Sequence, residues 1–97
     1  MPLTLPMPAR HRFAPGSIVA TPTALAVTTP QQILESIERH LTGDWGDVTP
    51  EDAQANEDAV TNDHRVFSVY QMSDGNRLWI ITEANRVSTC ILLPSDY

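Results

Sequence analysis

Lysine is absent from this sequence of 97 residues, and cysteine occurs only once, at position 90. A single cysteine can form neither an internal disulfide nor a CxxC zinc site, and it favours a reducing compartment, so we expect a cytoplasmic protein. Prolines interrupt residues 1–15, where a secretory signal would need an unbroken apolar run. No stretch approaches the roughly eighteen apolar residues that span a bilayer. We therefore expect neither export nor membrane insertion.

Glycine is also scarce: the four glycines, at positions 16, 43, 46 and 75, fall in neither GxGxxG nor GxxxxGK spacing. This excludes the common phosphate-binding loops. The three histidines at positions 11, 40 and 64 lack the HxxxH and HExxH spacings of metal sites. We expect no metal and no cofactor.

The charge is strongly one-sided, with a formal net value of −6 and only arginine as a basic residue. Seven carboxylates lie between positions 44 and 63 with no basic residue among them: Asp44, Asp47, Glu51, Asp52, Glu57, Asp58 and Asp63. Such a segment repels a phosphate backbone, whereas nucleic-acid-binding proteins carry basic patches. We therefore do not expect direct binding to nucleic acid.

Three Thr-Pro pairs predict helix starts after residues 21, 29 and 49, because each places a hydroxyl cap before a proline at the first helical position. The helix over 30–42 has the clearest pattern. Gln32 completes a capping box, the apolar side chains recur at helical spacing, and Gly43 supplies the left-handed C-cap. The helix near 23–27 is expected to be about one turn long, and the helix after residue 50 has a thin apolar face.

From Arg65 onward the apolar period changes to the alternation of β-strands. We predict strands over 65–72, 77–83 and 88–93, joined by turns at Asp74-Gly75 and at residues 84–86. The expected fold is α+β, with N-terminal helices packed on a three-stranded antiparallel β-meander and an extra edge strand near Ile18. Residues 16–97 form one domain, preceded by an extended or disordered leader over 1–15.

Four residues are candidates for acid–base chemistry: His40, Glu83, Arg86 and Thr89. If they met at one end of the sheet, carboxylate, imidazole and guanidinium could cleave a phosphodiester without a metal. The structural alternatives are a protonated His40 that interacts with the negative end of its helix, and a solvated Glu83–Arg86 ion pair. Cys90 lies within a predicted strand, where we expect a small apolar side chain and no chemistry.

The turn Asp44-Trp45-Gly46-Asp47 follows the best helix directly. Its tryptophan is expected either to close the end of the core or to form the rim of a pocket, and its aspartates to cap the turn. For binding to a partner, the candidate residues are Asp44, Trp45, Asp47, Glu51, Asp52, Glu57 and Asp58.

Several segments together resemble a family of short plasmid- and phage-borne proteins, some of them labelled restriction-related. These segments are 39–40, 43–46, 65–70, 78–83 and 91–94. The family pattern has an aspartate at position 85, where this chain has Asn85, and paired threonines where it has Ser88-Thr89. The order of a helix ending in Arg-His and then a meander is also similar to the barnase, colicin and EndoU ribonuclease folds.

Two functions follow as expectations. The first is an accessory protein of a mobile element that binds a host protein, such as a defence complex, through its acidic face in an anti-restriction or anti-CRISPR manner. The second is a small metal-independent ribonuclease or nucleotide-acting enzyme. The net charge favours binding, because a nuclease must attract a polyanion. A homodimer through an open edge of the sheet is a third, structural alternative.

Overall fold

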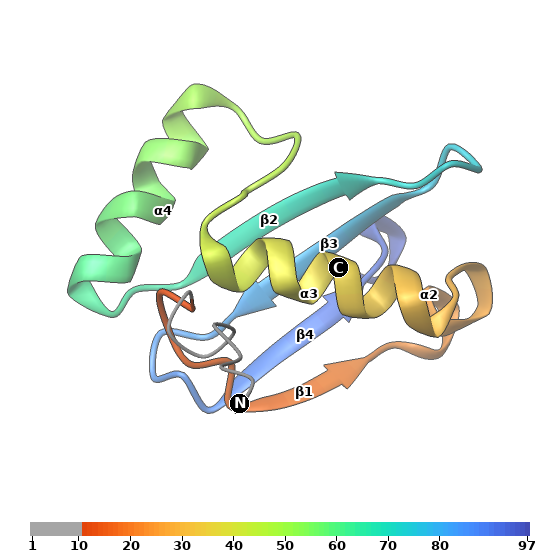
Figure 1. The fold of residues 1–97 in the computed structure, drawn as a ribbon, viewed down its shortest axis with the longest axis horizontal. Coiled ribbons are helices and arrows are strands. Elements are labelled where there is room, and N and C mark those ends of the chain that lie inside the picture. The colour runs from red at the N-terminus through yellow and green to blue at the C-terminus, as the bar shows by residue number, and fades with distance from the viewer. Residues whose placement is uncertain (1–10) are drawn as a thin grey trace, which may run out of the picture.

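The computed structural model describes residues 11–97, which form one sheet with helices on one face and at one edge (Figure 1). The elements follow in the order β1 (Ser17–Ala20), α2 (Pro22–Val27), α3 (Pro30–Thr42), α4 (Pro50–Asn62), β2 (Val66–Gln71), β3 (Arg77–Thr82), β4 (Ser88–Leu92) and the 3-10 turn η1 (Pro94–Asp96). The expected α+β class is confirmed.

The sheet has four strands in the order β1-β4-β3-β2. The antiparallel pairs β2–β3 and β3–β4 form the expected meander, but β1 adds a fourth strand that runs parallel to β4. Backbone N–H groups of Ser17 and Thr21 donate to the carbonyls of Val87 and Ile91, each at 2.9 Å. The three-stranded antiparallel sheet is therefore corrected to a mixed four-stranded sheet, in which the edge strand expected near Ile18 is present.

All three helices begin where the Thr-Pro pairs predict. The hydroxyls of Thr21, Thr29 and Thr49 each accept a hydrogen bond from the backbone N–H three residues later. Thr29 and Gln32 form the predicted capping box, and Gly43 ends α3 in the left-handed conformation with φ of 94°. These local signals fix the ends of α3, which places residues 36–41 over the sheet.

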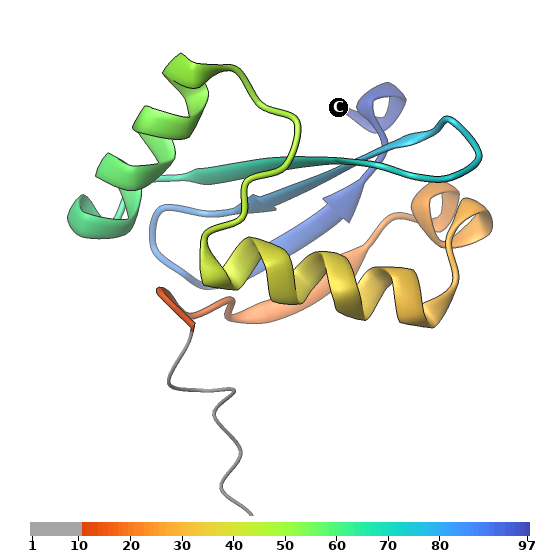
Figure 2. The same cartoon turned by 45° about the horizontal axis from the view of Figure 1, so that its top comes forward.

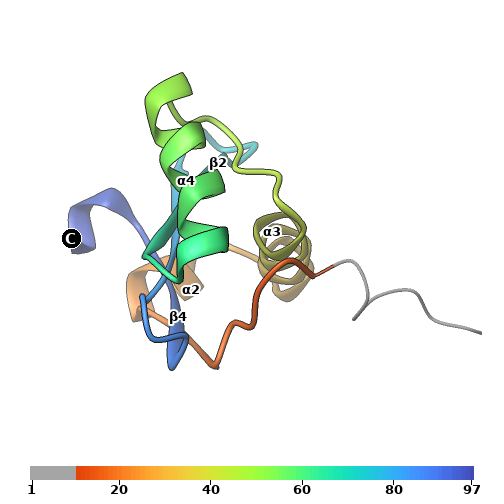
Figure 3. The same cartoon turned by 90° about the vertical axis from the view of Figure 1, so that its left-hand side faces the viewer.

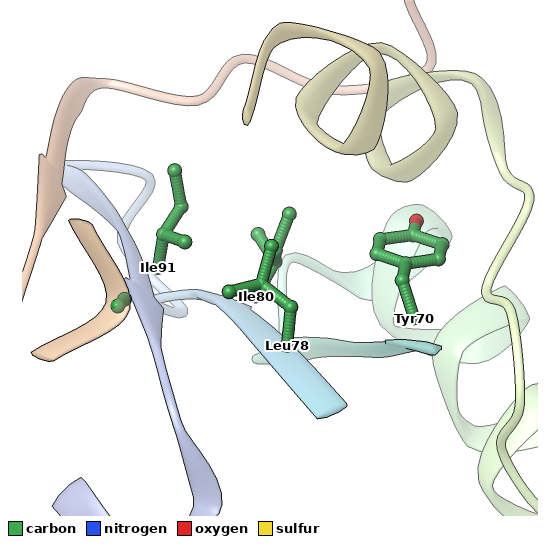
Figure 4. Packing of buried hydrophobic residues seen from close by; sticks show 5 residues of the cluster. Tyr70, Leu78, Ile80 and Ile91 are labelled. Atoms are coloured by element: carbon green, nitrogen blue, oxygen red, sulfur yellow. The ribbon is translucent and has the colours of Figure 1, made fainter. Parts of the chain in front are cut away.

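The main core lies between α3 and one face of the sheet. Tyr70, Leu78, Ile80 and Ile91 alternate along β2, β3 and β4 and point to this face, where they are fully buried or nearly so (Figure 4). The view in Figure 2 shows α3 lying along the sheet. We call the opposite side of the sheet the open face. Figure 3 shows α3 on one side of the strands and the end of the chain on the other.

The outer edge of β2 is covered by other parts of the chain. The side-chain amide of Asn56 in α4 donates to the carbonyl of Phe67 at 2.7 Å and accepts from its N–H at 3.0 Å. The backbone N–H of Val69 donates to the carbonyl of Trp45, and the carbonyl of Val69 accepts from the backbone N–H of Asp47. This edge therefore has partners for the backbone groups of both residues, which removes a site for further strand pairing.

The first described residues pack on the helices. The imidazole of His11 lies 3.1 Å from a carboxylate oxygen of Glu38, and the backbone N–H of Arg12 donates to the carbonyl of Leu41 at 2.8 Å. Residues 11–15 of the expected leader are thus attached to the fold, and residues 1–10 lie outside the described residues. None of the helices between residues 11 and 97 is long and apolar enough to cross a membrane.

Candidate functional site

His40 lies at the centre of a buried chain of hydrogen bonds. Its side chain is fully buried, with Nδ1 2.6 Å from the hydroxyl of Ser68 and Nε2 2.9 Å from that of Thr82. The hydroxyl of Thr82 lies 2.7 Å from that of Thr89, which donates to the carbonyl of Pro15 at 2.8 Å. The helix, the three strands of the meander and the segment before β1 are thereby joined through side-chain atoms.

The direction of each hydrogen bond in this chain follows from the bond at its end, between Thr89 and the carbonyl of Pro15. The carbonyl of Pro15 only accepts, so Thr89 uses its proton there and accepts from Thr82. Thr82 has then donated its own proton and must accept from His40 Nε2–H. Nδ1 carries no proton and accepts from Ser68. Every polar atom of the imidazole is therefore satisfied in the neutral form.

The same surroundings oppose protonation of His40. Burial, followed by the positive charge of Arg86, lowers the pKa of His40 from 6.5 to about 3. A second ring proton would also face the Ser68 oxygen, whose hydroxyl would have to turn away. The expected protonated imidazole at the end of α3 is therefore wrong, because the ring is sealed beneath the helix. The position of His40 in the sequence, one residue before Leu41, does not show that its ring is buried and neutral.

Arg86 acts as a cap for α4 from a distant turn. Its guanidinium donates to the carbonyls of Ala59 at 2.9 Å and His64 at 2.5 Å, and it lies over the ring of Phe13. The last carbonyls of a helix carry partial negative charge and lack partners within the helix. Arg86 adds a charged donor to the Ala59 carbonyl, which already accepts from the backbone N–H groups of Asp63 and His64, so the terminal nitrogens of Arg86 are engaged in the fold.

Glu83 lies on the other side of the sheet. Its carboxylate is 3.9 Å from Nε of Arg65. Burial raises the pKa of the Cys90 thiol, and the charges of Asp96 and Glu83 raise it further, which indicates that Glu83 is near Cys90. Cys90 pairs with Ile81 and so belongs to the open face. The structure thus brings His40 and Thr89 into one network with Arg86 beside it, but leaves the Glu83 carboxylate on the opposite face.

The seven predicted partner-binding residues divide into two groups. Trp45 is only 7% exposed and packs with Ala59 and Val66, so it closes a second part of the core rather than offering a contact. Asp44, Asp47 and Glu57 are held by arginines within 2.8 Å: Arg39, Arg77 and Arg12 respectively. Side-chain bonds to these arginines lower the pKa of Asp44 and of Glu57.

The other three predicted residues remain on the surface of α4. Glu51, Asp52 and Asp58 are exposed, and none of them lies within 4.0 Å of a basic side chain among residues 11–97. We call these three the acidic stripe. No described basic side chain pairs with the acidic stripe, whereas Asp44, Asp47 and Glu57 of the same segment form ion pairs within the fold.

A different site occupies the open face. Arg65, Phe67, Trp79, Ile81 and Tyr97 line a hollow of about 320 Å³, which we call the aromatic hollow. The rings of Phe67 and Trp79 meet edge to face at 5.1 Å between centroids, and those of Trp79 and Tyr97 at 5.5 Å. The Arg65 guanidinium lies 5.6 Å from the Tyr97 ring centre. Such a preformed apolar concavity with a polar rim is typical of a binding site.

The 3-10 turn η1 holds one wall of the aromatic hollow. The carboxylate of Asp96 accepts hydrogen bonds from Thr23 at 2.6 Å, from Thr21 at 2.7 Å and from the backbone N–H of Leu93 at 2.9 Å. These bonds, with Thr23 first, lower the pKa of Asp96. They fasten the turn to the start of α2, and Tyr97 then reaches back to Trp79.

The sequence carries a partial signal for this hollow. The alternation correctly assigns Phe67 to the face opposite Ser68 and Tyr70, and Trp79 and Ile81 alternate with Leu78 and Ile80 in the same way. Arg65 begins the predicted strand 65–72 and alternates onto the same side as Phe67, whereas the wall from Tyr97 carries no such signal, since it comes from a segment outside the strands.

Among the described residues, no group of three or more histidine, cysteine, aspartate or glutamate side chains could hold a metal ion. Comparison with known proteins found no matching family model, no matching curated protein and no matching solved structure.

Proposed function

We propose that this chain is a small binding protein that engages another protein, and that the aromatic hollow is the centre of the contact. The observation that carries the proposal is the solvent-open hollow formed by Phe67, Trp79 and Tyr97, with Arg65 at its rim. Tryptophan, tyrosine and arginine are the residues most enriched in the energetic centres of protein interfaces. Here three of them are already arranged, so little ordering is needed upon binding.

The area of the aromatic rings sets how much a truncation in the aromatic hollow should weaken binding to the partner. A buried aromatic side chain covers about 150–250 Å², and truncation of a central aromatic residue usually weakens an interface by at least about 2 kcal/mol. Tyr97 is 70% exposed in the free chain, so most of its surface is available to a partner. Burial of that surface favours association.

The acidic stripe supports this proposal through charge. Glu51, Asp52 and Asp58 lie on the helix that ends three residues before Arg65, which is a wall of the aromatic hollow. Together with the net charge of −6, they favour a partner with a basic surface and accelerate its approach. We therefore propose that the stripe steers the partner and that the hollow supplies most of the affinity.

The partner that we propose is a host protein, such as a component of a defence complex, bound by an accessory protein of a plasmid or phage. The basis for this class is the resemblance of residues 39–40, 43–46, 65–70, 78–83 and 91–94 to proteins of such elements. We propose the cytoplasm as the compartment, since the only cysteine is a free thiol. The ribonuclease alternative gains no observation in its favour, because the imidazole of His40 has no access to solvent.

Affinity capture from a host lysate tests the proposal. We expect the wild-type protein to retain a partner that Trp79→Ala does not retain. Leu25→Ala is the control, because Leu25 is an exposed apolar side chain that lies outside the aromatic hollow. Circular dichroism must show that both variants are folded. Equal retention by wild type and Trp79→Ala, or retention of no specific protein, would refute the hollow as a contact site.

A further inference from the structure

The two edges of the sheet differ in their protection. The β2 edge is covered by Asn56 and by residues 45–47, as described above. At the β1 edge, Ser17 and Thr21 turn their N–H groups toward β4. Because backbone groups alternate along a strand, Ile18 and Ala20 turn their N–H and C=O groups away from the sheet. Among residues 11–97, no segment pairs with this side of β1.

Among the described residues, β1 itself has no protection by charge, and the nearby Asp96 carboxylate lies on Thr21, just past the end of the strand. Exposed edges are normally guarded by lysine, by a proline within the strand, by a bulge or by a covering segment. Residues 13–34 contain no charged side chain, although the whole chain carries −6. Ile18 and Val19 are 46% and 49% exposed. Both sides of this short strand therefore offer apolar surface next to backbone groups that have no partner within residues 11–97.

We propose that β1 pairs with β1 of a second copy of this chain, in an antiparallel arrangement that joins the two sheets. A second copy fits because the edge is neutral, so that two acidic chains can meet there. The acidic stripe lies beyond β2, at the opposite edge of the sheet from β1 (Figure 1). Pairing through β1 keeps the two acidic stripes at the outer ends of the dimer.

The register follows from the direction of the backbone groups. Pairing Ile18 of one copy with Ala20 of the other satisfies every outward N–H and C=O group of both strands. In this register Val19 lies directly opposite Val19 of the second copy. Val19 pairs with Cys90 and thus lies on the open face. The short strand gives a small interface, so we expect a weak dimer that needs high protein concentration to form.

Sedimentation equilibrium over micromolar to millimolar concentrations tests the proposal. We expect wild type to dimerise, and both Val19→Lys and Val19→Glu to be monomeric, with dissociation constants raised at least about tenfold, because like charges then face each other. An equimolar mixture of the two variants should form a heterodimer. Ala55→Lys, on the exposed side of α4, gives the same charge change as Val19→Lys and should dimerise as wild type.

Three results would overturn the proposal. These are a monomeric wild type at millimolar concentration, a dimer unaffected by Val19→Lys, and the absence of a heterodimer from folded variants. If the Val19 variants do not fold, amide hydrogen exchange of wild type decides the question. The amides of Ile18 and Ala20 should exchange more slowly as protein concentration rises, and rates independent of concentration would contradict the pairing.

Discussion

Acid should destabilise this protein through His40 in a defined pH window. The folded pKa of about 3 lies below the ordinary value of 6.5, so the unfolded chain binds a proton that the folded chain excludes. The stabilising effect of the neutral ring is complete above pH 6.5 and is lost as the pH falls toward 3. The loss amounts to about 1.4 kcal/mol per pH unit, or roughly 5 kcal/mol over the window.

This loss is large for a domain of this size, whose total stability is typically about 5–15 kcal/mol. Urea denaturation of wild type and of His40→Gln between pH 4 and pH 7 isolates the effect, because both proteins share all carboxylates. The difference in unfolding free energy between the two proteins should change by about 1.4 kcal/mol per pH unit within the window. His64→Gln is the control: His64 is exposed, and this variant should keep the wild-type slope.

Two outcomes would show that the fold does not exclude a proton from His40. One is a set of parallel stability curves for wild type and His40→Gln. The other is an NMR titration in which the His40 ring gains its proton near the ordinary pKa. The nitrogen chemical shifts should instead show a single neutral tautomer, protonated at Nε2, above pH 5.

Three further substitutions test the packing by urea denaturation. Asn56→Ala removes both hydrogen bonds to the β2 edge and should destabilise by about 2 kcal/mol, whereas Gln54→Ala on the exposed side of α4 should have little effect. In Gly46→Ala the new Cβ would clash with the backbone oxygen of Val69 at φ of 73°, so we expect a loss of at least about 2 kcal/mol. Gly75→Ala meets no atom within 4 Å and should lose about 1 kcal/mol. Arg86→Lys loses the forked contact with α4 and should cost about 1–3 kcal/mol.

Each of these expectations has a contrary result. If Asn56→Ala and Gln54→Ala lower the unfolding free energy equally, Asn56 has no special role at the β2 edge. If Gly46→Ala and Gly75→Ala lower it equally, the close contact at Gly46 does not limit the side chain there. For Arg86→Lys the comparison is Arg77→Lys, since Arg77 forms an exposed ion pair worth at most about 1 kcal/mol. Equal losses in these two variants would show that Arg86 is an ordinary surface charge.

The sequence predicts the local parts of the fold well, because their signals lie within a few residues. The capping box of Thr29 and Gln32 and the C-cap at Gly43 define α3, and the alternation from Val66 defines β2. The parallel pairing of β1 with β4 joins segments about seventy residues apart, as in Ile18 with Thr89, and no local pattern specifies the direction of such a strand.

The candidate sites were harder to predict for the same reason. The partners of His40 are 28 and 42 residues away, so its burial and neutral state follow only from the fold. The charges of Asp44 and Asp47 are visible in the sequence, but the arginines that neutralise them are not adjacent in a recognisable pattern. The aromatic hollow depends on Tyr97, whose position is set by Asp96 and the hydroxyls near α2.

NMR of the labelled chain with the purified captured protein can show whether the aromatic hollow contacts a partner protein. We expect the largest shift changes at the Trp79 indole N–H and the Ile81 methyl groups, with smaller changes along the acidic stripe. In calorimetry Trp79→Ala should raise the Kd at least about thirtyfold. Shift changes confined to α4, together with an unchanged Kd for Trp79→Ala, would contradict this contact.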